Sequence, residues 1–87
     1  MSTYAVRLRA SAQKEYDKLP EGERVRVLDR LIGLQDNPRP SGVETLSGEF
    51  RGLHRVRVGD YRVLYEISDA ERIVSVVRIR PRGRAYR

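Results

Sequence analysis

Three short segments with alternating apolar and polar residues follow one another in the C-terminal half of the chain, separated only by tight turns. The first, Leu53–Val58, turns at Gly59-Asp60. The second, Tyr61–Ser68, turns at Asp69-Ala70-Glu71 and leads into a third, Arg72–Arg80. A period of two is typical of strands with one buried face, and turns this short join antiparallel neighbours. The pattern therefore predicts an antiparallel meander of three strands.

The first part of the chain contributes one more strand candidate and a short helix. Residues 3–9 alternate in the same way and are predicted to form a strand. Ser11 then stands where a side-chain oxygen can cap the free amides of a helix N-terminus. Ala12, Tyr16 and Leu19 recur at helical spacing, so one face of this helix is expected to be apolar.

A second helix is predicted from about Glu21 to Gln35, after Pro20, whose missing N–H suits a first helical turn. Asp36-Asn37-Pro38 ends it, because the residue before a proline disfavours helical backbone. Its expected apolar stripe consists of Val25, Leu28, Leu31 and Ile32. Residues 37–51, with two prolines and two glycines, are predicted to be a loop.

The element order, strand–helix–helix–strand–strand–strand, predicts an α+β fold class. We expect an N-terminal helical hairpin packed on one face of a mostly antiparallel four-stranded sheet. The chain is expected to be a single domain, 1–87, because it contains no repeat and no linker long enough to divide it. Pro81 and Gly83 argue against a regular strand in the tail that follows Arg80.

Composition excludes several kinds of site. The chain has no cysteine and one histidine, His54, so disulfides are excluded, and neither a metal site nor a cofactor is predicted. His54 is interpreted as a packed edge residue rather than a catalyst. No apolar run approaches the roughly 20 residues of a membrane helix. The N-terminus lacks the apolar core of a signal peptide, so we expect a cytoplasmic protein without membrane contact.

The net charge of +6 is unevenly distributed. Residues 1–49 carry eight basic and eight acidic residues, whereas residues 50–87 carry ten arginines and four acidic residues. A guanidinium group binds phosphate with two hydrogen bonds and stacks on bases. The excess suggests a nucleic acid, a membrane surface or an acidic protein as partner, or else a solvated basic face.

Alternation decides which of these arginines share a face. Arg55 and Arg57 point the same way, and Arg62 points away from the apolar face of its strand, where Tyr61 and Tyr65 are expected in the core. The helices are expected to cover that apolar face, which leaves the three arginines together on the uncovered one. The last strand and the tail add Arg78, Arg80, Arg82, Arg84 and Tyr86. Converging guanidinium groups beside a tyrosine predict a site for a phosphodiester and an unstacked base.

The segment Gly52–Tyr65, with Leu46 before it and Arg82 and Tyr86-Arg87 after the last strand, resembles the RelE/ParE toxin superfamily of type II toxin–antitoxin systems. The resemblance extends over essentially the whole chain. Its RelE branch implies a ribosome-dependent, metal-independent endoribonuclease that cleaves mRNA in the A site of the 30S subunit and so inhibits translation. The ribose 2′-hydroxyl would attack the adjacent phosphate and leave a 2′,3′-cyclic phosphate. Such a reaction needs a base, positive charge on the phosphorane and a proton for the leaving oxygen.

The resemblance implies a role for each basic position. Arg62 would stabilise the phosphorane, and Arg55 and Arg57 would bind the region of the scissile bond. Arg82 would stabilise or protonate the leaving group, and Tyr86 would stack on an mRNA base. Further RNA contacts are predicted at Arg78, Arg80, Arg84 and Arg87.

The general base is harder to place. Arginine does not serve readily, because its pKa exceeds about 12. Relatives with lysines at the strand positions have a possible base there, and others have a histidine before the tail arginine, where this chain has Pro81. Still others use a glutamate in the loop before the meander. Glu44, two residues before Leu46, is therefore the candidate base.

Two other functions remain open at this point. One is a ParE-like toxin that inhibits DNA gyrase by protein–protein contact, without nuclease activity. Another is an inactive basic module that only binds its antitoxin and operator DNA. The short helical hairpin and the full set of arginines favour the nuclease. The expected partner is a cognate acidic antitoxin that covers the hairpin and the sheet edge, displaces the tail, and links the chain indirectly to operator DNA.

Overall fold

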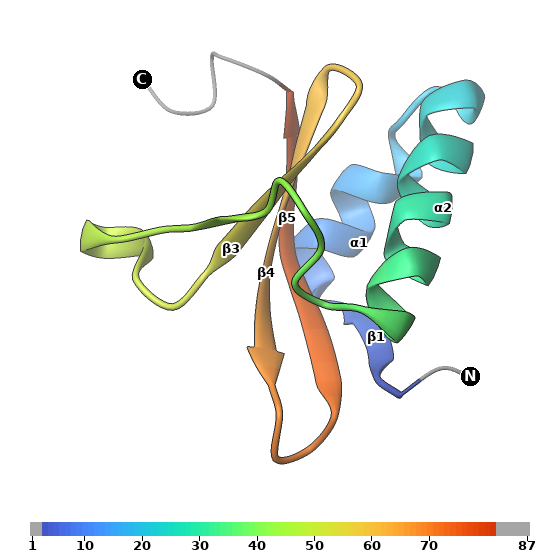
Figure 1. Ribbon diagram of the computed structural model, residues 1–87. Helices are drawn as coiled ribbons and strands as arrows, with labels where there is room; N and C mark the ends of the chain where they lie inside the picture. The colour runs from blue at the N-terminus through green and yellow to red at the C-terminus, as the bar shows by residue number, and fades with distance from the viewer. Residues whose placement is uncertain (1–2, 82–87) are drawn as a thin grey trace.

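The computed structural model describes residues 3–81, in which two helices lie together on one side of a five-stranded sheet (Figure 1). In chain order the elements are β1 (Ala5–Leu8), α1 (Ala10–Asp17), α2 (Glu21–Asp36), β2 (Glu44–Thr45), a short 3₁₀ helix (Gly48–Phe50), β3 (His54–Val58), β4 (Tyr61–Ser68) and β5 (Ile73–Pro81). The predicted α+β class is confirmed, and all six predicted elements occur in the predicted order, with β2 and the 3₁₀ helix added between α2 and β3.

The sheet has the strand order β1-β5-β4-β3-β2. Strands β3, β4 and β5 form the predicted antiparallel meander, and β1 pairs with β5 in parallel. The predicted strand number of four is wrong by one, because Glu44 and Thr45, expected in a loop, pair with Arg55 and His54 as β2. A two-residue strand is too short to produce a periodicity that sequence reading detects. The tail was expected to leave the sheet at Pro81, which instead ends β5 opposite Tyr61.

The core fills the layer between the helices and the sheet. It consists mainly of Ala12, Leu19, Val27, Leu31 and Leu34 from the helical side and of Val56, Val63, Tyr65, Val74, Val76 and Ile79 from the sheet. Tyr65 is fully buried, as predicted, and its hydroxyl donates to the carbonyl of Pro38 at 2.7 Å. Burial raises the pKa of Tyr65 to about 12. Tyr61 is half-buried and packs against the same core.

The predicted apolar stripe of α2 is largely wrong. Val25, Leu28 and Ile32 are 62%, 47% and 52% exposed, and only Leu31 of the predicted set is buried. The buried face instead consists of Val27, Leu31 and Leu34. Both sets recur at helical spacing, so periodicity cannot tell which face meets the sheet. The helix therefore carries a second apolar face toward solvent.

Ser11 does not cap α1, as the sequence had suggested. The helix begins at Ala10, and its N-cap residue is Arg9, which makes no side-chain capping hydrogen bond. The Ser11 hydroxyl instead donates to the carbonyl of Val77 on β5 at 3.0 Å. This side chain thus connects α1 to the sheet rather than completing its own helix.

Candidate functional site

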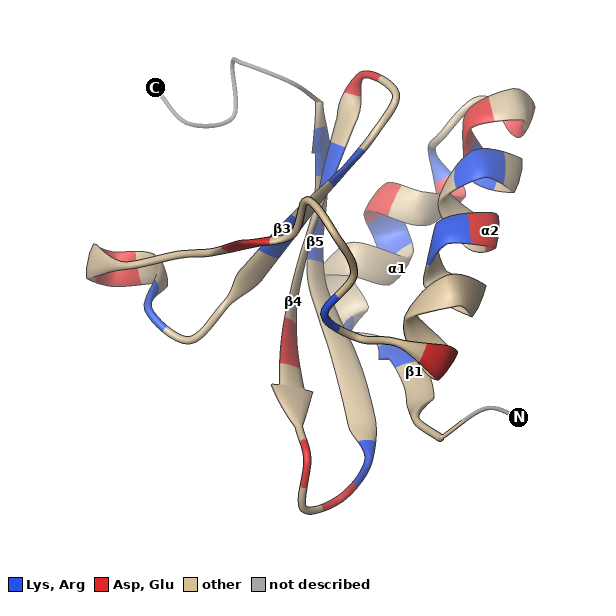
Figure 2. Ribbon diagram, in the orientation of Figure 1, with Lys and Arg blue, Asp and Glu red and all other residues tan. Residues whose placement is uncertain are grey.

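The face of the sheet opposite the helices carries two cross-strand rows of basic side chains. The first row consists of Arg57 on β3, Arg62 on β4 and Arg80 on β5. The second row consists of Arg55, Leu64 and Arg78. Residues paired across antiparallel strands share a face, with Cβ atoms about 4.5–5.5 Å apart. Figure 2 shows basic positions gathering where β3 crosses β4 and β5.

A β-bulge brings the two β5 arginines to this face. Leu64 pairs with Arg78, whereas its neighbour Tyr65 pairs with Val76, so the residue between these two β5 positions is extra. An extra residue reverses the alternation of side chains beyond it. Val76 therefore faces the core, while Arg78 and Arg80 face away from the helices. Without the bulge, both arginines would share the face of Val76.

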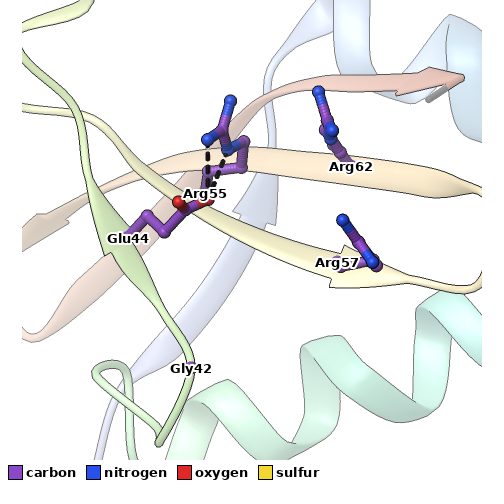
Figure 3. A pocket seen from close by; sticks show the side chains of 5 residues that line it. All are labelled: Gly42, Glu44, Arg55, Arg57 and Arg62. Carbon is purple, nitrogen blue, oxygen red and sulfur yellow. Dashed lines mark hydrogen bonds and ion pairs between the residues drawn. The ribbon is translucent and has the colours of Figure 1, made fainter. Parts of the chain in front are cut away.

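A hollow of about 370 Å³ lies on this face and is lined by Gly42, Glu44, Arg55, Arg57 and Arg62 (Figure 3). Arg57 and Arg62 lie side by side, and Glu44 reaches Arg55 from the neighbouring strand β2. Oε1 of Glu44 accepts a hydrogen bond from Nε of Arg55 at 2.8 Å and forms an ion pair with its Nη2 at 2.6 Å. The predicted grouping of the three arginines on the uncovered face is confirmed. Their chemical roles stay predictions.

Like charges placed directly opposite one another on neighbouring strands destabilise a sheet. The row Arg57–Arg62–Arg80 contains two such pairs. Between the arginines of the second row, Leu64 is only 2% exposed and forms an apolar floor apart from the main core. The arrangement concentrates positive charge on one face of the sheet, which favours the binding of an anion there.

Of the other predicted RNA-binding residues, the structure describes two, and neither lines the hollow. Arg78 and Arg80 do not line the hollow, because both turn toward Glu15 of α1: Arg78 Nη1 lies 3.4 Å and Arg80 Nε 3.2 Å from its Oε2. The four remaining predictions, Arg82, Arg84, Tyr86 and Arg87, lie outside the described residues. The sequence had given no sign of the contact with Glu15.

Glu66 on β4 forms an ion pair with Arg9. Within residues 3–81, no group of three or more His, Asp or Glu side chains is arranged to hold a metal ion. The same part of the chain contains no helix long and apolar enough to cross a membrane.

His54 lies on the opposite face of β3 from the arginines. Its ring centroid is 5.6 Å from that of Tyr65, and its Nδ1 lies 3.3 Å from the Thr45 hydroxyl. Burial lowers the pKa of His54, and the charge of Arg39 lowers it further. The ring therefore packs beside the core, as the sequence suggested, and does not reach the hollow.

Comparison with known proteins places this architecture in a family. The family described as the ParE toxin of the type II toxin–antitoxin system parDE matches residues 6–86. The toxin RelE of Mycobacterium tuberculosis is 35% identical over 85 residues, which cover 97% of this chain and 87% of that protein.

Solved structures agree with the sequence comparison. The archaeal RelE–RelB complex from Pyrococcus horikoshii OT3 contains a chain that is 32% identical, with a TM-score of 0.82 over 94% of this chain and 98% of that one. The toxin–antitoxin complex RelBE2 of Mycobacterium tuberculosis contains one that is 30% identical, with a TM-score of 0.83 over 92% and 99%. The chain therefore belongs to the RelE/ParE superfamily of toxins from type II toxin–antitoxin systems.

Proposed function

We propose that the chain is a ribosome-dependent endoribonuclease that cleaves mRNA in the ribosomal A site. The observation that carries this proposal is the hollow lined by Arg55, Arg57 and Arg62 on the uncovered face of the sheet. The similarity of the chain to toxins named RelE also supports the RelE branch of the superfamily. Guanidinium groups fixed on strands can meet the charge that develops on a phosphorane without reorganising.

In this proposal Arg62 is the main contact for the scissile phosphate. It lies on the central strand of the meander, with Arg57 and Arg80 directly opposite it on the two neighbouring strands. Negative charge on the phosphorane relieves the repulsion between these side chains, so the transition state gains more from the site than the free RNA does. Arg55 binds RNA beside the scissile bond.

Glu44 remains the proposed base for the 2′-hydroxyl. The hydrogen bond and the ion pair from Arg55 both reach its Oε1, and its Oε2 is the oxygen we assign to proton abstraction. The side chain of Glu44 is 61% exposed and accessible to a bound ribose. Arg82 and Tyr86, which lie outside the described residues, keep their proposed roles at the leaving oxygen and at a stacked base.

A defined translation complex tests the activity. Purified protein is added to a stalled ribosome with an open A site, and the mRNA is examined for A-site cuts with 2′,3′-cyclic phosphate ends. Arg62→Ala is expected to lower the cleavage rate by about 10²–10³-fold, the typical effect of removing one transition-state donor. The matched control is Arg26→Ala, which removes an exposed arginine from α2 and should cut at the normal rate.

The second candidate is inhibition of DNA gyrase, which the family description ParE favours. The two functions are separated by running a gyrase supercoiling assay beside the cleavage assay. Intact mRNA together with inhibited supercoiling would contradict the nuclease and support the gyrase inhibitor.

We also propose an acidic antitoxin as the partner, since the related RelE chains were solved with RelB. The exposed residues Val25, Leu28 and Ile32 line a surface hollow of about 300 Å³ on α2, and a smaller groove of about 130 Å³ lies between α2 and β1. Apolar patches of this kind mark protein interfaces. An apolar segment of the antitoxin fits this surface, and an acidic segment fits the arginines on the other layer.

A further inference from the structure

The edge of β5 is completed by a helix instead of a strand. β1 pairs with β5 only from Ile73 to Val76, although β5 continues to Pro81. Beyond Val76, α1 lies beside the edge (Figure 1). The hydroxyl of Ser11 donates to the carbonyl of Val77, and the N–H of Ile79 donates to Oε1 of Glu15 at 2.8 Å. Ser11 and Glu15, one helical turn apart, thus satisfy backbone groups that a neighbouring strand would otherwise pair.

Glu15 also binds the two arginines that extend the rows of the site. Its Oε2 lies 3.2 Å from Nε of Arg80 and 3.4 Å from Nη1 of Arg78. Its side chain is only 24% exposed, which limits competition from water. Arg80 lies directly opposite Arg62 on the neighbouring strand, yet this contact draws its guanidinium toward α1.

Carboxylates therefore bind the arginines at both ends of the second row and at the β5 end of the first row. Glu44 binds Arg55 at the β2 end, and Glu15 binds Arg78 and Arg80 at the β5 end. A guanidinium that is paired with a carboxylate must exchange that partner before it can bind a phosphate. A phosphate of the RNA must therefore displace a carboxylate to bind Arg55, Arg78 or Arg80.

We propose that Glu15 is a positioning residue that limits how many phosphates of an RNA strand the chain contacts. It holds Arg78 and Arg80 at the edge of β5, away from the hollow that Arg55, Arg57 and Arg62 line. This inference rests on the proposed function, because it assumes that RNA lies across the arginine face. Removing the negative charge of Glu15 releases two more phosphate contacts.

The test is Glu15→Gln, in which the amide oxygen can still accept the hydrogen bond from Ile79. Affinity for a short, unstructured single-stranded RNA is measured by anisotropy over a range of salt concentrations. Each added phosphate contact steepens the dependence of log affinity on log salt by about 0.7 for single strands. With both arginines released the slope steepens by about 1.4, so that between 50 and 200 mM salt the variant loses roughly sevenfold more affinity than the wild type.

Two controls separate positioning from a general effect of charge. Asp17→Asn makes the same charge change on the same helix, at a carboxylate that accepts from Gln13 rather than contacting the sheet. It should leave the salt slope unchanged. In a background with Arg78→Gln and Arg80→Gln, the Glu15→Gln change should no longer alter the slope, because the arginines through which it acts are gone.

Several results would overturn the inference. One is a lower melting temperature in Glu15→Gln with an unchanged salt slope, which would make Glu15 only an edge clamp. Another is an Asp17→Asn variant that steepens the slope equally. Absence of RNA binding by Glu15→Gln at low salt would also overturn it. Cleavage by the wild type on the ribosome is scored separately, so the proposed function can stand when this inference fails.

Discussion

The two uncovered surfaces of the molecule differ in chemistry and in the layer that carries them. The outer face of the sheet holds arginines in cross-strand rows, partly balanced by Glu44 and Glu15 at the two ends. The outer face of α2 holds Val25, Leu28 and Ile32. On the first surface, like charges lie opposite one another and repel, and on the second surface apolar side chains are exposed to water. We expect each surface to be stabilised by a different kind of ligand: an anion on the arginine face and an apolar segment on the face of α2.

The separation of these surfaces constrains how an antitoxin can neutralise the toxin. A partner segment bound only to the apolar face of α2 would leave the arginine hollow on the opposite layer accessible. Inhibition then requires a partner long enough to pass around the sheet edge, or a segment that displaces the tail. An acidic chain that orders on binding suits this geometry, because it can cover both surfaces without being preformed.

The largest predicted effect tests the chemistry of the arginine face. Glu44→Gln should lower single-turnover cleavage on the ribosome by about 10²–10⁴-fold, the usual contribution of a general base. RNA binding should be retained or strengthened, because the change frees Arg55 from its carboxylate partner. Measurement of both quantities on one preparation separates catalysis from binding.

Glu49→Gln is the matched control, since it alters an exposed carboxylate in the neighbouring 3₁₀ helix and should leave cleavage unchanged. A Glu44→Gln variant that cuts at the wild-type rate would remove Glu44 from the mechanism. The reaction would then depend on charge stabilisation by the arginines and on positioning of the mRNA by the ribosome.

The next effect concerns the apolar face of α2. Leu28→Asn should weaken antitoxin binding by at least about 30-fold, which corresponds to a hot-spot loss of roughly 2 kcal/mol. Cleavage by the free toxin and its melting temperature should change little, because Leu28 is 47% exposed. The control is Lys14→Gln, which changes an exposed side chain of α1 outside this apolar face and should leave antitoxin binding unchanged. Undiminished antitoxin binding by Leu28→Asn would show that this face is not the docking surface.

The fold could be predicted where local signals were unambiguous. The meander follows from alternation in β3, β4 and β5 and from the Gly59-Asp60 turn, in which Gly59 adopts a positive φ of 59°. The orientation of α2 could not be predicted, because Val27 and Leu28 belong to two overlapping apolar patterns. Which pattern is buried depends on how the helix meets the sheet, and that is a tertiary property.

The candidate site was predictable to the same extent. Alternation alone groups Arg55, Arg57 and Arg62, since the hairpin turn fixes their register. The contact between Glu15 and β5 was not foreseeable, because it depends on where β1 stops and on a bulge near Val77. Neither the end of a short strand nor a one-residue bulge leaves a clear periodic signal in the sequence.

The smallest predicted effect is a difference in how the two layers respond to pH. Arginine side chains stay charged between pH 7.5 and about 5.5. The arginines on the outer face of the sheet should therefore give RNA binding no pH dependence over this range. His54 lies on β3 and faces the helices, and burial lowers the pKa of its side chain. Its folded-state pKa lies below the unfolded value of about 6.5, so the unfolded chain takes up the proton first.

The contribution of His54 to stability is therefore present above pH 6.5 and is lost as the pH falls toward its folded-state pKa. Denaturant midpoints measured over this range should decline more steeply for the wild type than for His54→Gln, which cannot titrate. A parallel decline in both proteins would assign the acid sensitivity to groups other than His54. Because His54 and Arg55 are adjacent on β3 yet point to opposite layers, stability and RNA binding should respond independently to acid.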